Sequence, residues 1–269
     1  MRIEYLLARR VPDVPSPVLR DVNALLERRG HIVTGWVPEA RLTRADTRVP
    51  QADLYLLKSH TELALSEAGL LHDQGARLLN PFLSCVTAQD KITASRRLRA
   101  AGVPSPATWI TGDLSQAAHL LADGPLVVKP HRGHRGVGVS VVRTPAELAA
   151  VPDPGTPLVV QRYVPGPGED LKVYVAGDQV FAVRKPFDAE SFMRPGRPVP
   201  VSREVRAAAA GVRDAFGLDL FGVDVIEGVD GPVVVDVNYF PGYKGVPDAA
   251  PFIAGVIDAW ARSGAARAS

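Results

Sequence analysis

The sequence predicts an α/β lobe followed by an α+β region. Short apolar runs alternate with helical patterns over residues 1–86. A glycine-rich stretch then lies between two apolar runs, and two further apolar runs carrying acidic residues form a hairpin near the C-terminus. The first pattern is typical of a parallel sheet covered by helices, and the later ones are typical of antiparallel sheets.

The N-terminal pattern is that of a Rossmann-like lobe with a parallel sheet. Its expected elements are strands at 3–8, 31–37, 53–57 and 76–80, with helices at 17–29 and 62–74. The dinucleotide fingerprint G-x-G-x-x-G is absent after the first strand. Arg9, Arg10 and Lys58 fall at carboxyl ends of expected strands, where open α/β sheets bind ligands, so they are candidates for holding an anion. The alternative is that they are ordinary surface cations.

A helix is expected at 86–101, ended by Gly102. Lys91 falls in its first turn, where a cation is unfavourable to the helix dipole. That position makes Lys91 a candidate functional residue.

The glycine-rich stretch is expected to connect two strands within residues 126–142. Gly133, Gly136 and Gly138 would let backbone N–H groups approach phosphate oxygens, and Lys129 lies on the strand before them. The stretch lacks the G-K-[ST] sequence of a Walker loop. A mobile turn without ligand is the alternative interpretation.

The remaining half is expected to be antiparallel sheet with helices on one side. The expected elements are strands at 158–164, 171–176 and 179–184, a loop at 187–200, and helices at 201–216 and 249–261.

The hairpin begins with Leu220-Phe-Gly-Val-Asp-Val-Ile and returns through Val233 to Tyr239. Asp236 and Asn238 are two residues apart and share a face, and Asp224 faces them across the ladder. Two carboxylates and an amide oxygen suit Mg²⁺, which completes its shell with water and nucleotide phosphates. The alternative is that they are solvated strand acids.

Composition argues against several classes of partner. The 31 basic and 29 acidic residues give a net charge of +2, which offers no reason to expect a nucleic acid or an anionic membrane. No apolar run approaches the roughly 20 residues of a membrane span, and the start of the chain lacks the order of a signal peptide. Cys85 is a single cysteine and cannot form an internal disulfide, so a cytoplasmic protein is expected.

These motifs together resemble the ATP-grasp superfamily over nearly the whole chain. The matching features are Asp90-Lys91, the K-P-x-x-G-x-x-G-x-G pattern from Lys129 to Gly138, the strand ending at Gln161, and the set Asp224, Asp236 and Asn238. The resemblance implies an ATP-grasp fold with a Rossmann-like lobe at 1–86, a small subdomain at 87–163 and a C-terminal subdomain at 164–269.

The resemblance also implies a MgATP site, with Mn²⁺ as a possible substitute. Lys91 and Lys129 would contact the nucleotide or its phosphates, and Gly133, Gly136 and Gly138 would close over the triphosphate. The adenine would meet Gln161, Tyr163 and Val164, chiefly through backbone groups, and Asp224, Asp236 and Asn238 would hold the metal.

Two branches of the superfamily compete for the reaction. Lys172, Arg184 and the Asp236-Val-Asn-Tyr-Phe-Pro-Gly-Tyr sequence look like the inositol tris- and tetrakisphosphate kinases. The glycine loop looks like the glutamate ligases that modify a ribosomal protein's tail. We expect Lys172 and Arg184 to be catalytic and lean to a kinase of a polyol phosphate, with the carboxylate–amine ligase as the alternative.

The acceptor is expected to be a small anionic molecule. The residues expected to bind it are Arg9, Arg10, Lys58, His134 and Gly242. A non-catalytic ATP-binding module is a minor alternative, and the sequence leaves the oligomeric state open.

Overall fold

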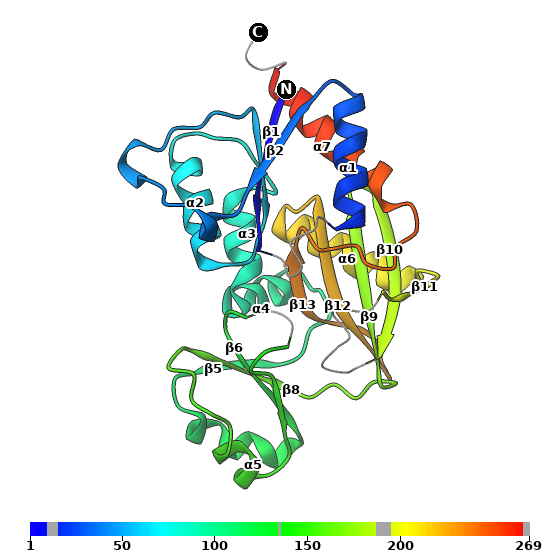
Figure 1. Ribbon diagram of the computed structural model, residues 1–269. Helices are drawn as coiled ribbons and strands as arrows, with labels where there is room; N and C mark the ends of the chain where they lie inside the picture. The colour runs from blue at the N-terminus through cyan, green and yellow to red at the C-terminus, as the bar shows by residue number, and fades with distance from the viewer. Residues whose placement is uncertain (10–15, 134–135, 187–194, 266–269) are drawn as a thin grey trace.

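The computed structural model describes residues 1–9, 16–133, 136–186 and 195–265, with the last two residues described by their backbone only. Arg10 and His134 therefore lie outside the described residues. Within those ranges the chain forms three sheets (Figure 1). No described helix is long and apolar enough to cross a membrane.

The N-terminal lobe has the parallel sheet that the sequence predicts. Its strand order is β2-β1-β3-β4, from β1 (Arg2–Leu7), β2 (Ile32–Trp36), β3 (Leu54–Lys58) and β4 (Leu78–Leu79). Ser16 and Thr61 cap helices α1 (Pro17–Arg28) and α2 (Glu62–Asp73) by accepting backbone N–H groups in the first turn. Two 3₁₀ turns, η1 (Pro38–Ala40) and η2 (Ala45–Thr47), lie between β2 and β3.

The prediction of a single helix at 86–101 is wrong, because the structure has two helices in this part of the chain. Helix α3 (Phe82–Gln89) ends at Asp90, which leaves helical geometry at φ −94° and ψ 108°. The Asp90 carboxylate then accepts the N–H groups of Ile92 and Thr93 and starts α4 (Lys91–Ala100). A capping aspartate both breaks one helix and begins the next, and it makes Lys91 the first residue of α4.

A small antiparallel sheet follows, with strand order β5-β8-β6-β7. Its strands are β5 (Thr108–Thr111), β6 (Leu126–Pro130), β7 (Ser140–Val142) and β8 (Leu158–Arg162). The 3₁₀ helix η3 (Leu114–Asp123) and helix α5 (Pro145–Ala149) cover it, and neither was expected from the sequence. Leu126, Val128 and Val160 pack with Leu120 and Leu148 in a separate core.

The C-terminal sheet is antiparallel, with order β11-β10-β9-β12-β13. Its strands are β9 (Glu169–Ala176), β10 (Gln179–Pro186), β11 (Arg197–Val199), β12 (Leu220–Gly228) and β13 (Gly231–Tyr239). Helices α6 (Arg203–Phe216) and α7 (Ala249–Ala265) both contact β9. Strand β11 falls within the stretch expected to be a loop; it pairs with β10 through Ala182–Arg184, which local sequence does not reveal.

One hydrophobic core joins the N-terminal lobe to the C-terminal sheet. Helix α7 lies beside α1 (Figure 1), where His31 contacts Asp258 at 2.7 Å and Arg29 donates to the carbonyl of Ala254. The small sheet lies below the other two sheets in Figure 1 and has a hydrophobic core of its own. The cores therefore group the chain into two packed bodies, while the expected boundaries at 86/87 and 163/164 remain predictions.

Asn80 makes the central polar connection between the lobe and the hairpin. Its Nδ2 donates to the carbonyl of Leu220 at 2.7 Å, and its Oδ1 accepts the N–H groups of Asp219 and Leu220 at 2.9 and 3.0 Å. The side chain is 1% exposed, so no solvent can replace these bonds. Asn80 therefore fixes the start of β12 against the end of β4.

Replacing Asn80 with Ala should lower the free energy of unfolding by about 2–4 kcal/mol, because the N–H groups of Asp219 and Leu220 lose their acceptor. The carbonyl of Leu220 also loses one donor, although it keeps the N–H of Phe240. Chemical denaturation followed by circular dichroism measures this. The matched control is Gln74→Ala, which removes an exposed side-chain bond to the carbonyl of Leu70 and should change stability by less than about 0.5 kcal/mol. Equal stability of the two variants would contradict this role of Asn80.

Candidate functional site

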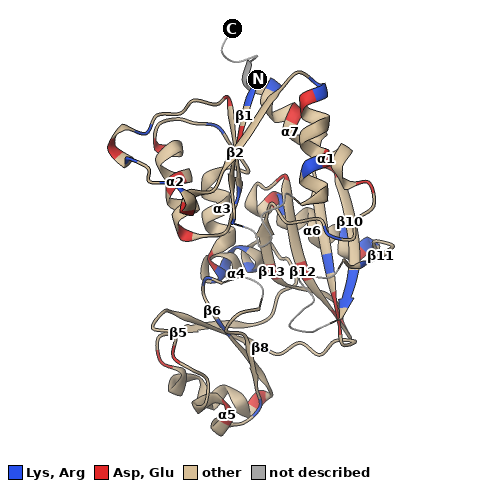
Figure 2. Ribbon diagram, in the orientation of Figure 1, with Lys and Arg blue, Asp and Glu red and all other residues tan. Residues whose placement is uncertain are grey.

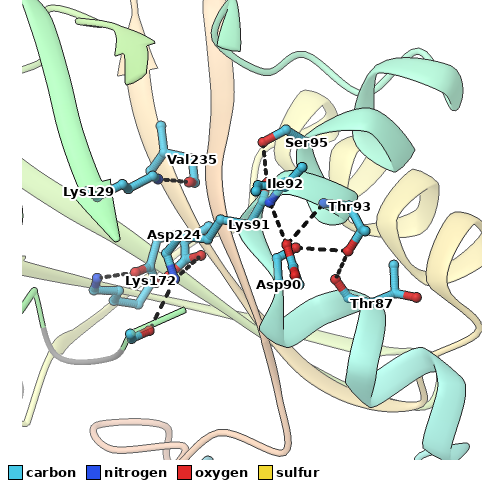
Figure 3. Close-up of polar contacts among 12 residues, drawn as sticks. Thr87, Asp90, Lys91, Ile92, Thr93, Ser95, Lys129, Lys172, Asp224 and Val235 are labelled. Carbon is cyan, nitrogen blue, oxygen red and sulfur yellow. Dashed lines mark hydrogen bonds and ion pairs between the residues drawn. The ribbon is translucent and has the colours of Figure 1, made fainter. Parts of the chain in front are cut away.

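The acidic hairpin forms with the register that the sequence predicts. Asp224 lies directly opposite Asp236, and Gly222 lies opposite Asn238. The next pairing is Val225 with Val234, so β13 carries an extra residue, Val235, in a bulge. The bulge frees the carbonyl of Val235 from the ladder, and that oxygen accepts a hydrogen bond from Lys129 Nζ at 3.0 Å (Figure 3).

Lys172, on β9, forms the closest ion pair in the site. Its Nζ lies 2.7 Å from Asp224 Oδ2 and 3.1 Å from Asp170 Oδ2 (Figure 3). Burial alone would lower the pKa of Lys172, but the two carboxylates outweigh it and hold the pKa well above its ordinary value. Lys172 is therefore a fixed positive charge.

Lys129 reaches the same place from β6 in the small sheet. It is 7% exposed, and burial lowers its pKa, while the charge of Asp236 acts in the opposite direction. A buried ammonium group held by one carbonyl has capacity for further acceptors. Lys129 is thus suited to meeting an anion in the space between the two sheets.

Lys91 extends from the start of α4 toward the hairpin (Figure 3). Its backbone N–H donates to the carbonyl of His131, and its Nζ donates to the carbonyl of Gly133 at 3.1 Å. The same Nζ lies 3.5 Å from Asp236 Oδ1. Lys91 therefore connects the glycine loop to the acidic hairpin.

The two facing carboxylates give the site its affinity for positive charge. Burial raises the pKa of Asp224, and the nearby charge of Asp236 acts in the same direction while Lys172 opposes it. The described residues contain no group of three or more His, Cys, Asp or Glu arranged for a metal. The carboxylates of Asp224 and Asp236 and the amide oxygen of Asn238 are oxygen donors of the kind that Mg²⁺ prefers. Such an ion takes its other ligands from water and phosphate.

The glycine loop needs its glycines for conformation and for space. Gly136 and Gly138 both have φ of 72°, in the left-handed region. A Cβ on Gly138 would approach the Cγ of Pro130 to 2.9 Å, so a larger residue there would push the loop away from β6. Gly133 and Val137 are exposed, with Val137 71% exposed.

The expected adenine residues lie at the end of β8 and in the connection that follows. Gln161 is buried and donates from Nε2 to Thr108 Oγ1 at 3.0 Å. Tyr163 donates its backbone N–H to the carbonyl of Pro125, so only its carbonyl and ring are open to a ligand. Val164 packs near Gly228, at the turn of the acidic hairpin.

Arg184 is not brought to the carboxylate pair of Asp224 and Asp236, although it does contact the hairpin near its turn. It pairs with Leu171 on β9, so strand alternation places it on the face opposite Lys172. There it contacts Glu227 at 2.6 Å. The residue on the Lys172 face is Lys185, which the sequence interpretation missed although period-two alternation pointed to it.

Lys185 is 4% exposed, and its pKa is lowered by burial and by the charges of Lys172 and Lys244. Asp170 was also missed, because the expected strand began at residue 171, whereas β9 begins at Glu169 and carries Asp170 on the same face as Lys172.

Of the expected acceptor residues that the structure describes, Arg9 and Lys58 lie at the carboxyl ends of β1 and β3, and Gly242 follows β13. Arg9 is exposed and approaches the carbonyl of Glu39 at 3.5 Å. Lys58 Nζ lies 5.1 Å from the ring centre of Phe240, and Gly242 is exposed in the segment after β13. The structure places Lys58 near the hairpin and leaves Arg9 farther out. Both signs of charge occur in every lobe (Figure 2).

A cavity of about 230 Å³ adjoins the hairpin and was not expected from the sequence. It lies between the end of β3, the α3–α4 junction, the glycine loop and β13. Its lining residues are His60, Thr61, Glu62, Ala88, Gln89, Lys91, Arg132, Gly133, Val237, Asn238 and Tyr239.

Comparison with known proteins decides the family. Residues 88–254 match the model of the RimK-like ATP-grasp domain, which is more than half of the chain. The chain belongs to the RimK-like ATP-grasp family. This match contains the acidic hairpin and the three lysines described above, together with the glycine loop.

Two curated relatives are named as ligases. A probable alpha-L-glutamate ligase of Serratia proteamaculans (strain 568) is 32% identical over 190 residues, covering 64% of this chain and 62% of the relative. A probable alpha-L-glutamate ligase 2 of Shewanella amazonensis is 26% identical, over 75% of this chain and 73% of the relative. The chain thus matches less than two thirds of the length of the first of these relatives.

Solved structures show the same ATP-grasp fold. A RimK domain ATP-grasp protein from Sphaerobacter thermophilus DSM 20745 superposes with a TM-score of 0.79 at 20% identity, covering 97% of this chain and 100% of that one. D-cycloserine synthetase DcsG gives 0.74 at 18% identity, covering 98% and 100%. The α/β and α+β fold class predicted from the sequence is confirmed.

These comparisons correct the expected branch. The sequence interpretation leaned to a kinase of a polyol phosphate because of Lys172 and the motif from Asp236 to Tyr243. The family match and the named relatives favour the ligase alternative instead. The motifs misled because the two branches share the nucleotide site, and the residues that distinguish them lie at the acceptor.

Lys91→Met should loosen the glycine loop, because the Lys91 side chain connects Gly133 to Asp236. Hydrogen exchange measured by mass spectrometry should then show faster exchange in the peptide covering residues 136–142. Arg99→Met, which removes a cation from the last turn of the same helix, is the control and should leave that peptide unchanged. Equal exchange in the two variants would show that Lys91 does not hold the loop.

Proposed function

We propose that this chain is an ATP-dependent carboxylate–amine ligase. The observation that carries the proposal is the meeting of three lysines, from three different elements, at the hairpin of a RimK-like ATP-grasp domain. Lys91 and Lys172 contact its facing carboxylates, and Lys129 donates to the carbonyl of Val235 beside them. Fixed cations beside a carboxylate pair are what transfer of a phosphoryl group between oxygens requires.

In this proposal the three hairpin residues hold the metal. Asp224, Asp236 and Asn238 would bind Mg²⁺, and Mn²⁺ could replace it. When bound, the ion neutralises phosphate charge and draws electron density from the transferring group. A bound ion would neutralise the carboxylates, and Lys91 Nζ, now 3.5 Å from Asp236, would then be available to the nucleotide.

The remaining residues orient the nucleotide. Lys129 would contact a phosphate from the small sheet, and the N–H groups at Gly133, Gly136 and Gly138 would enclose the triphosphate. Gln161, Tyr163 and Val164 would border the adenine, with Tyr163 offering its carbonyl or ring. Lys129 lies on the small sheet and Lys91 on α4, so closure of the small sheet over the C-terminal sheet would bring Lys129 to phosphates that Lys91 also contacts.

The chemistry then has two steps. The acceptor carboxylate attacks the γ-phosphorus, the bond to the β-phosphate oxygen breaks, and an acyl phosphate and ADP form. An amine next attacks the acyl carbon, and inorganic phosphate leaves. Lys172 is placed beside Asp224 to neutralise the carboxylate or the transferring phosphoryl group, whereas Arg184, on the other face, is a structural cation in this proposal.

The acceptor would be an anionic small molecule or a peptide bearing a carboxylate. Lys58 lies near the hairpin and supports this, and Arg9, Arg10, His134 and Gly242 are proposed to border the same region. Lys185 and Lys244 add positive charge on the Lys172 face.

Asp236→Asn should reduce ATP turnover by at least about 100-fold, because one of two metal carboxylates is lost. The half-exposed side chain faces the site, so the melting temperature should stay within a few degrees. Product assays and differential scanning calorimetry measure the two effects. Turnover equal to the parent's would remove Asp236 from the metal site.

The reaction class is tested by product identity. The protein is incubated with MgATP and two panels, amino and dicarboxylic acids with amines, and inositol phosphates alone, and products are identified by mass. The proposal expects an amide with release of phosphate and ADP. A phosphorylated polyol would instead support a kinase, and no ATP consumption with either panel would support a non-catalytic ATP-binding module.

A further inference from the structure

A half-buried histidine stands in the cavity beside the acidic hairpin. His60 follows β3, and its ring packs on the ring of Tyr239 with centroids 4.3 Å apart. The Tyr239 hydroxyl is fixed in turn, within 2.8 Å of the carbonyl of Ser59 and 2.6 Å of Gln89 Oε1. Gln89 also donates from Nε2 to the carbonyl of His60 at 3.2 Å. The Tyr239 ring therefore supports the imidazole, and Gln89 holds both the Tyr239 hydroxyl and the His60 backbone.

This imidazole shares its cavity with residues of the proposed reaction centre. Asn238 and Lys91 line the same space, and Lys91 Nζ is 3.5 Å from Asp236. At about 230 Å³ the cavity suits a small group rather than a nucleotide. It opens beside the carboxylates, on the side of the parallel lobe, where the second substrate would approach.

We propose that His60 is the general base of the second step, an inference that rests on the proposed ligase function. The neutral amine attacks the acyl carbon, and its nitrogen then carries one proton too many. His60 accepts that proton through a ring nitrogen while the bond between the acyl carbon and the phosphate oxygen breaks. Inorganic phosphate leaves, an amide remains, and the imidazolium returns its proton to solvent.

The other ionisable groups around the ring are less suited to this task. Lys91 and Arg132 are cations that offer no acceptor, and burial raises the pKa of Tyr239, so its hydroxyl stays protonated. Glu62 is 79% exposed at the rim, 3.8 Å from Arg132. Lys58, two residues before His60, lies against the ring of Phe240. An imidazole is also the side chain whose ordinary pKa is nearest neutrality.

The test separates the two steps with hydroxylamine. This nucleophile is largely unprotonated at neutral pH and traps an acyl phosphate as a hydroxamate without needing a strong base. In His60→Asn, the rate of hydroxamate formation should stay within about twofold of the parent's. The rate of amide formation, measured with the amine from the panel that the parent protein uses, should fall about 10²–10⁴-fold.

His72→Asn is the matched control, because His72 packs on Phe82 with ring centroids 5.1 Å apart but lies on α2 outside the cavity. It should leave both products unchanged. His60→Gln should lose amide formation as His60→Asn does, since glutamine restores a hydrogen bond but not proton transfer.

Several outcomes would overturn the role of His60. These are amide formation unchanged in His60→Asn, both products lost together, rescue by His60→Gln, or the selective loss appearing in Glu62→Gln instead. If the parent protein forms hydroxamate and amide, any of these contradicts His60 alone. If the parent forms neither, the ligase function itself fails and the role of His60 with it.

Discussion

The organising constraint of this structure is a pair of carboxylates placed directly opposite each other in an antiparallel ladder. Like charges in such positions repel, and Asp224 and Asp236 would destabilise the hairpin if they stood alone. The fold offsets this with Lys172 at 2.7 Å from Asp224 and Lys91 at 3.5 Å from Asp236. The same arrangement supports the proposed function, because a divalent ion at these carboxylates would free Lys91 to contact a phosphate.

The rest of the architecture serves to deliver those cations. Lys91 comes from a helix that begins only because Asp90 interrupts the preceding one, and Lys129 comes from a small sheet with its own core. The bulge at Val235 provides the carbonyl that meets Lys129. Asn80 and helix α7 fix the parallel lobe against the hairpin, so the small sheet is the body left to move relative to a single larger one.

The parts of the site formed by residues close together in the sequence could be predicted well. The parts formed by contacts between distant elements could not. The set of Asp224, Asp236 and Asn238 could be placed on one hairpin because a strand repeats every two residues and the turn is short. The sequence shows that Arg184 and Lys185 lie on opposite faces of β10, but which of them shares the face of Lys172 depends on the register between β9 and β10. The cavity around His60 was invisible for the same reason, since its walls come from the parallel lobe, the helix junction and β13. The prediction of the kinase branch was wrong because both branches share the nucleotide motifs, and these motifs carry no information about the acceptor.

The central claim is that Lys91 leaves Asp236 for a phosphate when a metal ion binds the carboxylate pair. A crystal structure with Mn²⁺ and a non-hydrolysable ATP analogue tests this claim most directly. Anomalous scattering at the manganese edge should place the ion against Asp224, Asp236 and Asn238. In the same crystal, Lys91 Nζ should have left Asp236 for a phosphate oxygen. An ion bound elsewhere, or Lys91 still paired with Asp236 beside a bound nucleotide, would contradict the account.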